Sequence, residues 1–225
     1  MSESRIAPGL GFRPGAVTAL PLAVVVGLFG VSFGVISVSS GGIGAVAAVV
    51  MSASTFAGSA QFAAAAIVGA AGQPVAAIAA ALLLNARYIP IGVSVARFLP
   101  GGPVRRFLLA QLVIDESWAI AARGDGEFDG NRLIGAGAIL WLAWVGGTVV
   151  GVIGGDALGD PAALGLDAAF PALFLALLVP QLRSSTAVVV ALLGGGIALA
   201  LTPFTPPGVP IIAASTAALL GLVRR

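Results

Sequence analysis

The chain has 225 residues, of which 59% are hydrophobic and only 9% are charged. A soluble domain carries about 25% charged residues, so this chain has too few to cover a water-exposed surface. Its net charge of +2 comes from arginines scattered along the chain, which is no nucleic-acid-binding patch. Cys and His are both absent, which excludes disulfides, thiol nucleophiles, and thiolate or imidazole metal sites. We predict an integral membrane protein with no metal, cofactor or nucleic-acid partner.

Charged residues are missing from two long stretches, between Arg13 and Arg87 and between Arg183 and Arg224. A helix needs about 20 apolar residues to cross a bilayer, so each stretch holds at least two membrane segments. Only short loops remain outside them. We therefore predict that residues 1–225 form a single transmembrane domain with no soluble domain. Its fold class is all-α, a polytopic helical bundle with about six to eight membrane segments, some discontinuous or re-entrant.

The first span is predicted at residues 16–38. This apolar stretch is too long for a signal peptide and is followed by no clear cleavage site. Gly30 and Gly34 have the four-residue spacing that permits close contact with another helix. Residues 45–71 come next, and their centre is crowded with small polar side chains. Broken membrane helices offer free backbone groups to ions and substrates, so we predict a discontinuous or re-entrant segment there.

A single helix is predicted from residue 75 to 98, following Pro74, and a basic loop covers residues 100–106. A short apolar segment is expected at residues 107–122. Three charges fall near the middle of these two segments: Arg87, Asp115 and Glu116. A charge in the bilayer is costly, so such residues usually face a cavity or a partner of opposite charge.

The second half of the chain begins with a polar loop at residues 123–132. An uncharged span follows at 133–155, and its Trp141 and Trp144 are interpreted as anchors at the membrane interface. An acidic loop without arginine is expected at 156–167. Three further membrane segments are predicted near residues 168–183, 185–202 and 209–223.

The distribution of arginine predicts cytoplasmic N- and C-termini and places the acidic loop on the opposite side. Two topologies fit. If the loops at 99–106 and 123–132 are both cytoplasmic, the segment between them does not cross, and residues 45–71 enter and leave on one side. If every segment crosses, there are eight spans, and only Arg105 and Arg106 violate the positive-inside rule.

Arg87 and the two adjacent carboxylates allow two interpretations. An arginine–carboxylate bridge could simply hold two helices together. Alternatively, Arg87 steadies one carboxylate while the other faces the substrate path. The second interpretation is feasible because neighbouring residues of a helix point about 100° apart.

Small polar residues form a second candidate cluster. Ser52, Thr55 and Ser59 share one face if their segment is helical. Their hydroxyls either bond to carbonyls one turn earlier or line a polar cavity. Gln61 and Asn85 favour the cavity, because an amide in hydrocarbon needs partners.

Four segments, taken in order, resemble the signatures of the AzlC-type branched-chain amino acid permease family. They are residues 54–62 (STFAGSAQF), 85–88 (NARY), 115–118 (DESW) and 165–178 (GLDAAFPALFLALL). Trp118 stands where this family usually has Phe. Tyr88 stands where it often has His, a difference that bears on substrate choice or proton handling.

The resemblance implies a transporter rather than an enzyme. It implies the large subunit of a two-component exporter of valine, leucine and isoleucine, located in the cell inner or plasma membrane. The expected partner is a small hydrophobic AzlD-type membrane subunit, and a homo-oligomer is also compatible with the sequence.

A site for such a substrate must match an ammonium, a carboxylate and a small apolar side chain. We expect Asp115 or Glu116 to accept the ammonium and to be the candidates for proton coupling. Arg87, or amide N–H groups at a helix break near Gly58, would receive the carboxylate. Aromatic residues and alanines would line the apolar pocket. The full set of predicted substrate-binding residues is Ser54, Thr55, Phe56, Gly58, Gln61, Phe62, Asn85, Arg87, Asp115 and Glu116.

No phosphate-binding motif of the GxxxxGK[ST] kind occurs, so the energy is expected to come from a gradient or a partner. Burial favours the protonated form of a carboxyl group, which makes proton-coupled antiport the preferred mechanism. The alternatives are a small-solute or ion channel, a transporter subunit for another small amino acid, and a scaffold subunit that does not itself transport. An intramembrane enzyme is disfavoured by the absence of His and Cys.

Overall fold

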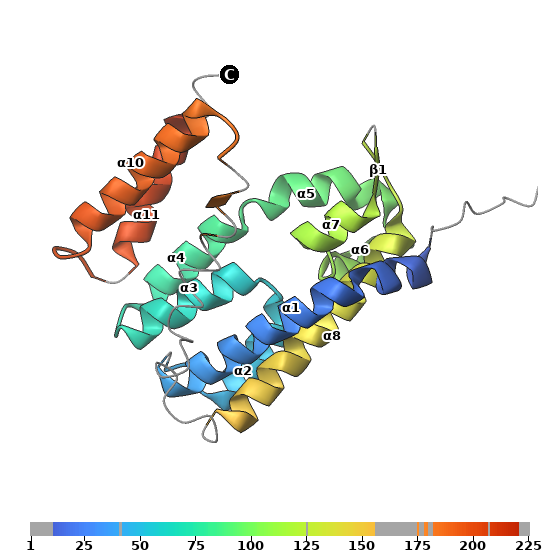
Figure 1. Ribbon diagram of the computed structural model, residues 1–225, viewed down its shortest axis with the longest axis horizontal. Helices are drawn as coiled ribbons and strands as arrows, with labels where there is room; N and C mark the ends of the chain where they lie inside the picture. The colour runs from blue at the N-terminus through green and yellow to red at the C-terminus, as the bar shows by residue number, and fades with distance from the viewer. Residues whose placement is uncertain are drawn as a thin grey trace, which may run out of the picture.

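The computed structural model describes residues 11–40, 42–124, 126–155, 175, 178–179, 182–206 and 208–220. These residues form helices joined by short connections, as the all-α prediction requires, apart from one small hairpin (Figure 1). The helices up to the hairpin are α1 (Phe12–Ser39), α2 (Ala45–Thr55), α3 (Gly58–Gly69), α4 (Pro74–Asn85), α5 (Tyr88–Val95), the 3₁₀ turn η1 (Ala96–Phe98), α6 (Pro103–Ala110) and α7 (Asp115–Ala121). Beyond it come α8 (Gly130–Gly154), α10 (Ser185–Leu201), α11 (Val209–Ser215) and the 3₁₀ turn η4 (Thr216–Ala218).

Helices α1 and α8 lie side by side and run in the same direction (Figure 1). Helix α8 has the same four-residue glycine spacing as α1, and its Gly147 and Gly151 face Gly27 and Val31 of α1. A Cβ at Gly30 or at either of these α8 glycines would collide with the opposite backbone. The predicted close helix contact is therefore confirmed, and it joins the two longest spans.

The predicted discontinuity within residues 45–71 is also confirmed. Helix α2 ends at Thr55, the next residue Phe56 adopts a left-handed backbone conformation with φ of 42°, and α3 begins at Gly58. Neither helix can cross a bilayer alone, since 12 residues extend only about 18 Å. Val68, near the end of α3, lies beside Gly42, just before α2. The segment thus starts and ends at the same end of the molecule, as a re-entrant segment does.

The single helix predicted over residues 75–98 is wrong. The chain is bent by 45° between α4 and α5, at Ala86 and Arg87. Pro90 explains the break, because proline has no N–H for the carbonyl of Ala86 and its ring crowds that carbonyl. The amide of Ile89 bonds the same carbonyl instead, over a distance of 3.1 Å.

The short segment predicted at residues 107–122 is wrong in its boundaries. It consists of two helices, α6 and α7, separated by residues 111–114, and α6 already begins at Pro103, inside the predicted basic loop. The polar loop at 123–132 contains an antiparallel hairpin of β1 (Ala122–Gly124) and β2 (Glu127–Phe128). Asp129 then caps α8 by accepting hydrogen bonds from the amides of Asn131 and Arg132.

The connection after α5 lies at the same end of the molecule as the hairpin. The backbone of Phe98 lies against Gly130, and Arg97 forms an ion pair with Glu127 at 3.0 Å. Helices α6 and α7 are each about 12 Å long or less, too short to cross a bilayer. This placement favours the topology in which the loops at 99–106 and 123–132 share one face.

Helices α10 and α11 fall within the last two predicted segments, and both are apolar but shorter than a full membrane span. They pack against each other, and α11 also contacts α4 (Figure 1). The predicted acidic loop at 156–167 lies outside the described residues, as does nearly all of the segment predicted near 168–183.

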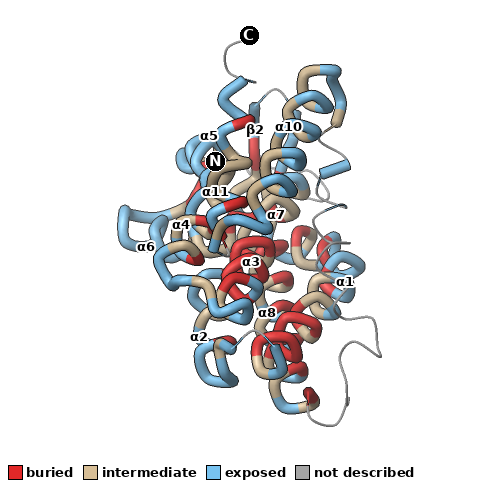
Figure 2. The backbone as a smooth tube through the Cα atoms, turned by 90° about the vertical axis from the view of Figure 1, so that its left-hand side faces the viewer, coloured by how far each residue is buried: buried red, intermediate tan, exposed pale blue. Residues whose placement is uncertain are grey.

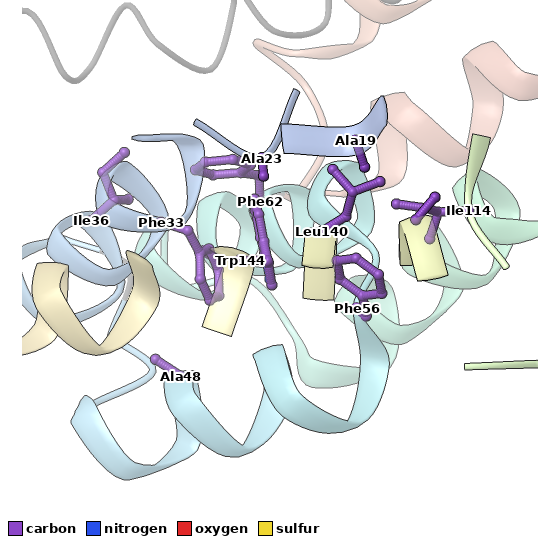
Figure 3. Close-up of a cluster of buried hydrophobic side chains, with 12 residues drawn as sticks. Ala19, Ala23, Phe33, Ile36, Ala48, Phe56, Phe62, Ile114, Leu140 and Trp144 are labelled. Atoms are coloured by element: carbon purple, nitrogen blue, oxygen red, sulfur yellow. The ribbon is translucent and has the colours of Figure 1, made fainter. Parts of the chain in front are cut away.

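The core lies where α1, α3 and α8 meet. Figure 2 shows buried backbone concentrated along α3 and along the face of α8 that meets α1. Phe33, Phe62 and Trp144 form its centre, with ring centroids 5.5 to 6.0 Å apart (Figure 3). The interpretation of Trp144 as an interface anchor is therefore wrong, because its side chain is 4% exposed and packs between helices.

Two helices among the described residues, α1 and α8, are long and apolar enough to cross a membrane. The bent pair of α4 and α5 adds a third if it is one span, and α2, α3, α10 and α11 are shorter apolar helices. This composition is that of a helical membrane bundle.

Candidate functional site

A cavity of about 80 Å³ lies where the helix breaks of α2/α3 and α4/α5 meet the start of α7. Its polar lining comes from Ser59, Arg87, Tyr88, Asp115 and Glu116. The apolar lining comes from α1, the α2/α3 break, the residue before α7 and α8, through Val26, Phe29, Phe56, Gly58, Ile114 and Trp144. Three of these apolar residues are labelled in Figure 3, where Phe56 and Ile114 lie at one edge of the core.

Arg87 links three separate elements at this cavity. Its Nη2 lies 3.0 Å from Oδ2 of Asp115 on α7, and 3.3 Å from the hydroxyls of Ser59 on α3 and Tyr88 on α5. Its guanidinium also lies 5.1 Å from the centroid of the Tyr88 ring. Arg87 sits in the α4/α5 break, so the bend at Ala86 and Arg87 is what brings it to α7.

The two carboxylates have different environments, as the interpretation with a functional role requires. Asp115 is paired with Arg87, whereas Glu116 lines the cavity and takes part in no ion pair with the residues that the structure describes. Both lie in the first turn of α7, where the helix dipole stabilises negative charge. Ser117 holds this turn, because its hydroxyl accepts from the amide of Ile114 and bonds the carbonyl of Leu112.

The α2/α3 break presents Phe56 and Gly58 to the cavity. Gly58 begins α3 and lies under the indole ring of Trp144, where a Cβ would come within 3.1 Å of the ring. A larger residue would push either the ring or the start of α3 away. The predicted residues that line the cavity are thus Phe56, Gly58, Arg87, Asp115 and Glu116.

Gln61 is fully buried and bonds other parts of the protein instead of lining the cavity. Its Oε1 accepts from the amide of Ala57 and from Nε1 of Trp144, both at 3.1 Å. Its Nε2 donates to the hydroxyl of Ser52, which lies 2.9 Å from the hydroxyl of Thr148. This network ties α2, α3 and α8 together at the break.

The remaining predicted site residues lie elsewhere. Phe62 is buried in the core, and Asn85 is absent from the cavity lining. Ser54 and Thr55 are exposed, and the hydroxyl of Ser54 bonds the carbonyl of Val50 one turn earlier. The shared face expected for Ser52, Thr55 and Ser59 does not form, because the helix ends at Thr55.

The sequence did not predict the cavity-lining residues that come from distant helices. Val26 and Phe29 lie on α1, Ile114 precedes α7, and Trp144 lies on α8. In sequence they are ordinary apolar membrane residues, and no local signal separates them from their neighbours. Tyr88 could have been predicted as a site residue, because it directly follows Arg87 in the sequence.

Comparison with known proteins identifies the family of this chain. Residues 21–158 match the family model described as AzlC protein, a range that holds every cavity residue and three of the four signatures. The fourth signature, at 165–178, lies beyond the match and mostly outside the described residues. Neither curated proteins nor solved structures gave a match. The family match covers more than half of the chain, which therefore belongs to the AzlC family and is a membrane transporter related to branched-chain amino acid permeases.

Proposed function

We propose that this protein exports branched-chain amino acids across the cell inner or plasma membrane, as the large subunit of a two-component secondary transporter. The observation that carries the proposal is the cavity in which Glu116 lies beside the Arg87–Asp115 pair under apolar walls. An amino acid with a small apolar side chain needs that combination of groups.

Each part of the substrate has a group to match. Glu116 takes the ammonium, since Asp115 is already engaged by Arg87. Arg87 takes the carboxylate, because a guanidinium has five N–H donors and the pair with Asp115 uses only one of its nitrogens. Phe29, Phe56 and Ile114 surround the apolar side chain.

Proton antiport supplies the energy in this proposal. Glu116 lies half-buried against apolar walls, an environment in which a carboxyl group can exchange a proton for a cationic ligand. A proton on Glu116 and the substrate ammonium then exclude each other, which couples the two movements. The small AzlD-type subunit completes the transporter.

The test follows efflux of valine and leucine from cells loaded with dipeptides, with and without a co-expressed small hydrophobic partner. Glu116→Gln keeps the side-chain shape but removes the charge and the proton. We expect it to reduce efflux at least tenfold while the protein stays in the membrane.

Glu127→Gln is the matched control, because this carboxylate lies on the exposed hairpin with Arg97. It should leave efflux unchanged. Normal, proton-dependent efflux by the Glu116→Gln variant would contradict the proposed role. Efflux that neither saturates nor runs uphill would instead indicate a channel.

A further inference from the structure

Tyr88 lines two cavities. One is the candidate site, and the other is a wider cavity of about 480 Å³ between α5 and α6. Apolar residues such as Val95, Leu99 and Phe107 surround the wider one, and Arg106 is its charged lining residue. The two cavities share only Tyr88 among their lining residues, so Tyr88 lies where they adjoin.

The hydroxyl of Tyr88 accepts a hydrogen bond from Arg87. A guanidinium Nη2 carries two hydrogens, yet Nη2 of Arg87 lies within hydrogen-bonding distance of three acceptors, on Asp115, Ser59 and Tyr88. The 3.0 Å contact with the charged Asp115 is the strongest of the three. The 3.3 Å contact with Tyr88 is therefore one that Arg87 can give up when another acceptor arrives.

The wider cavity lies toward the face that carries the hairpin. Leu99 follows η1, whose Phe98 lies against Gly130 at the start of α8, and Arg106 lies on α6. The candidate site lies deeper, because Val26 is near the middle of α1. The wider cavity thus lies nearer the hairpin face than the candidate site, and Tyr88 lies where the two adjoin.

We propose that Tyr88 is a gate between the candidate site and the wider cavity, held closed by Arg87 and released when a ligand carboxylate takes over that arginine. The inference rests on the proposed function for the identity of this ligand. The gate itself follows from the lining residues and the contacts of Arg87.

The natural absence of cysteine allows a direct test, since a single introduced thiol is the only one in the chain. Val26→Cys places the thiol in the candidate site, and Gly92→Cys places it in the wider cavity, where a Cβ meets no atom within 4 Å. A membrane-impermeant thiol reagent is applied to vesicles from the hairpin face, and the labelling rate is measured without amino acid.

We expect Tyr88→Ala to speed labelling at position 26 at least tenfold and to leave labelling at position 92 unchanged. Tyr88→Phe keeps the ring but loses the hydroxyl, so labelling at position 26 should rise by a smaller factor. Phe204→Ala removes an aromatic ring that is 83% exposed and belongs to neither cavity, and it should change neither rate. Unchanged labelling at position 26 in the Tyr88→Ala protein would overturn the gate.

Addition of L-valine tests the release step separately. It should speed labelling of the Val26→Cys reporter when Tyr88 is present and have no such effect in the Tyr88→Ala protein. If the gate variants behave as expected but valine has no effect, the gate stands and the amino acid substrate is contradicted. Labelling at position 92 shows in each case that the protein is inserted and reactive.

Discussion

The role of a polar residue in this protein depends on which residues it contacts. Arg87 illustrates this, because one guanidinium nitrogen contacts the distant Ser59 and Asp115 as well as the adjacent Tyr88. Its pairing with Asp115 is the expected structural bridge, and Glu116 then lines the cavity without an ion pair among the described residues. The two interpretations of this cluster are therefore compatible in one geometry.

Within the small polar cluster, substitution of Gln61 should destabilise the protein most. Gln61→Ala removes the acceptor of the Ala57 amide and the Trp144 indole, both buried, and each unsatisfied group costs about 1–3 kcal/mol. We expect Tm in detergent to fall by roughly 4 °C or more. Thermal unfolding followed by circular dichroism measures the change.

The control for Gln61 is Ser54→Ala. Ser54 is exposed and its hydroxyl bonds only a carbonyl of its own helix, so Tm should stay within about 2 °C. Equal Tm values for the two variants would show that the buried network does not stabilise the break.

At the scale of helices, breaks and close packing position the site. The breaks after Thr55 and Asn85 end two helices close to the cavity and bring Phe56 and Arg87 to it. The parallel contact of α1 and α8 supplies the opposite wall. That wall exists only because glycines allow the two backbones to touch.

The glycine contact has an internal control on α8. Gly147→Ala places a methyl group into the backbone of Gly27, which should destabilise the protein by about 1–3 kcal/mol. Gly146→Ala, one residue earlier, meets no atom within 4 Å and should be neutral or stabilising by up to about 1 kcal/mol. Thermal unfolding of the two variants compares them directly. A lower Tm for Gly146→Ala than for Gly147→Ala would contradict the close contact.

At the scale of the whole molecule, the positions of helix ends bear on the number of crossings. Residues 45–69 begin and end at one face, and the connection after α5 lies beside the hairpin at the other. This arrangement agrees with the topology in which two segments enter the membrane without crossing it. The cytoplasmic location of the hairpin face stays a prediction from the arginine distribution.

Single-cysteine labelling from the two sides of the membrane tests this topology. Cysteines at Ser40 and Gln73 should react from one side, and cysteines at Gly102 and Glu127 from the other, the cytoplasmic side. If every segment crosses, the cysteine at Gln73 would instead be labelled from the same side as that at Glu127. The cysteine at Gly102 would then be labelled from the same side as that at Ser40. All four positions are exposed, so lack of access does not decide the result.

The sequence by itself determined the class of protein, its family and the discontinuity within residues 45–71, because apolar length, charge and small polar side chains act locally. The sequence also contained the cause of the α4/α5 break, which is Pro90. The long apolar stretch nevertheless predicted a single helix. Only the tertiary structure decided which polar residues meet. Arg87 reaches Asp115 while Gln61 turns to Trp144 because the bends and the α1–α8 contact set the directions of whole helices. Those directions depend on packing between segments far apart in the chain, which no local pattern records.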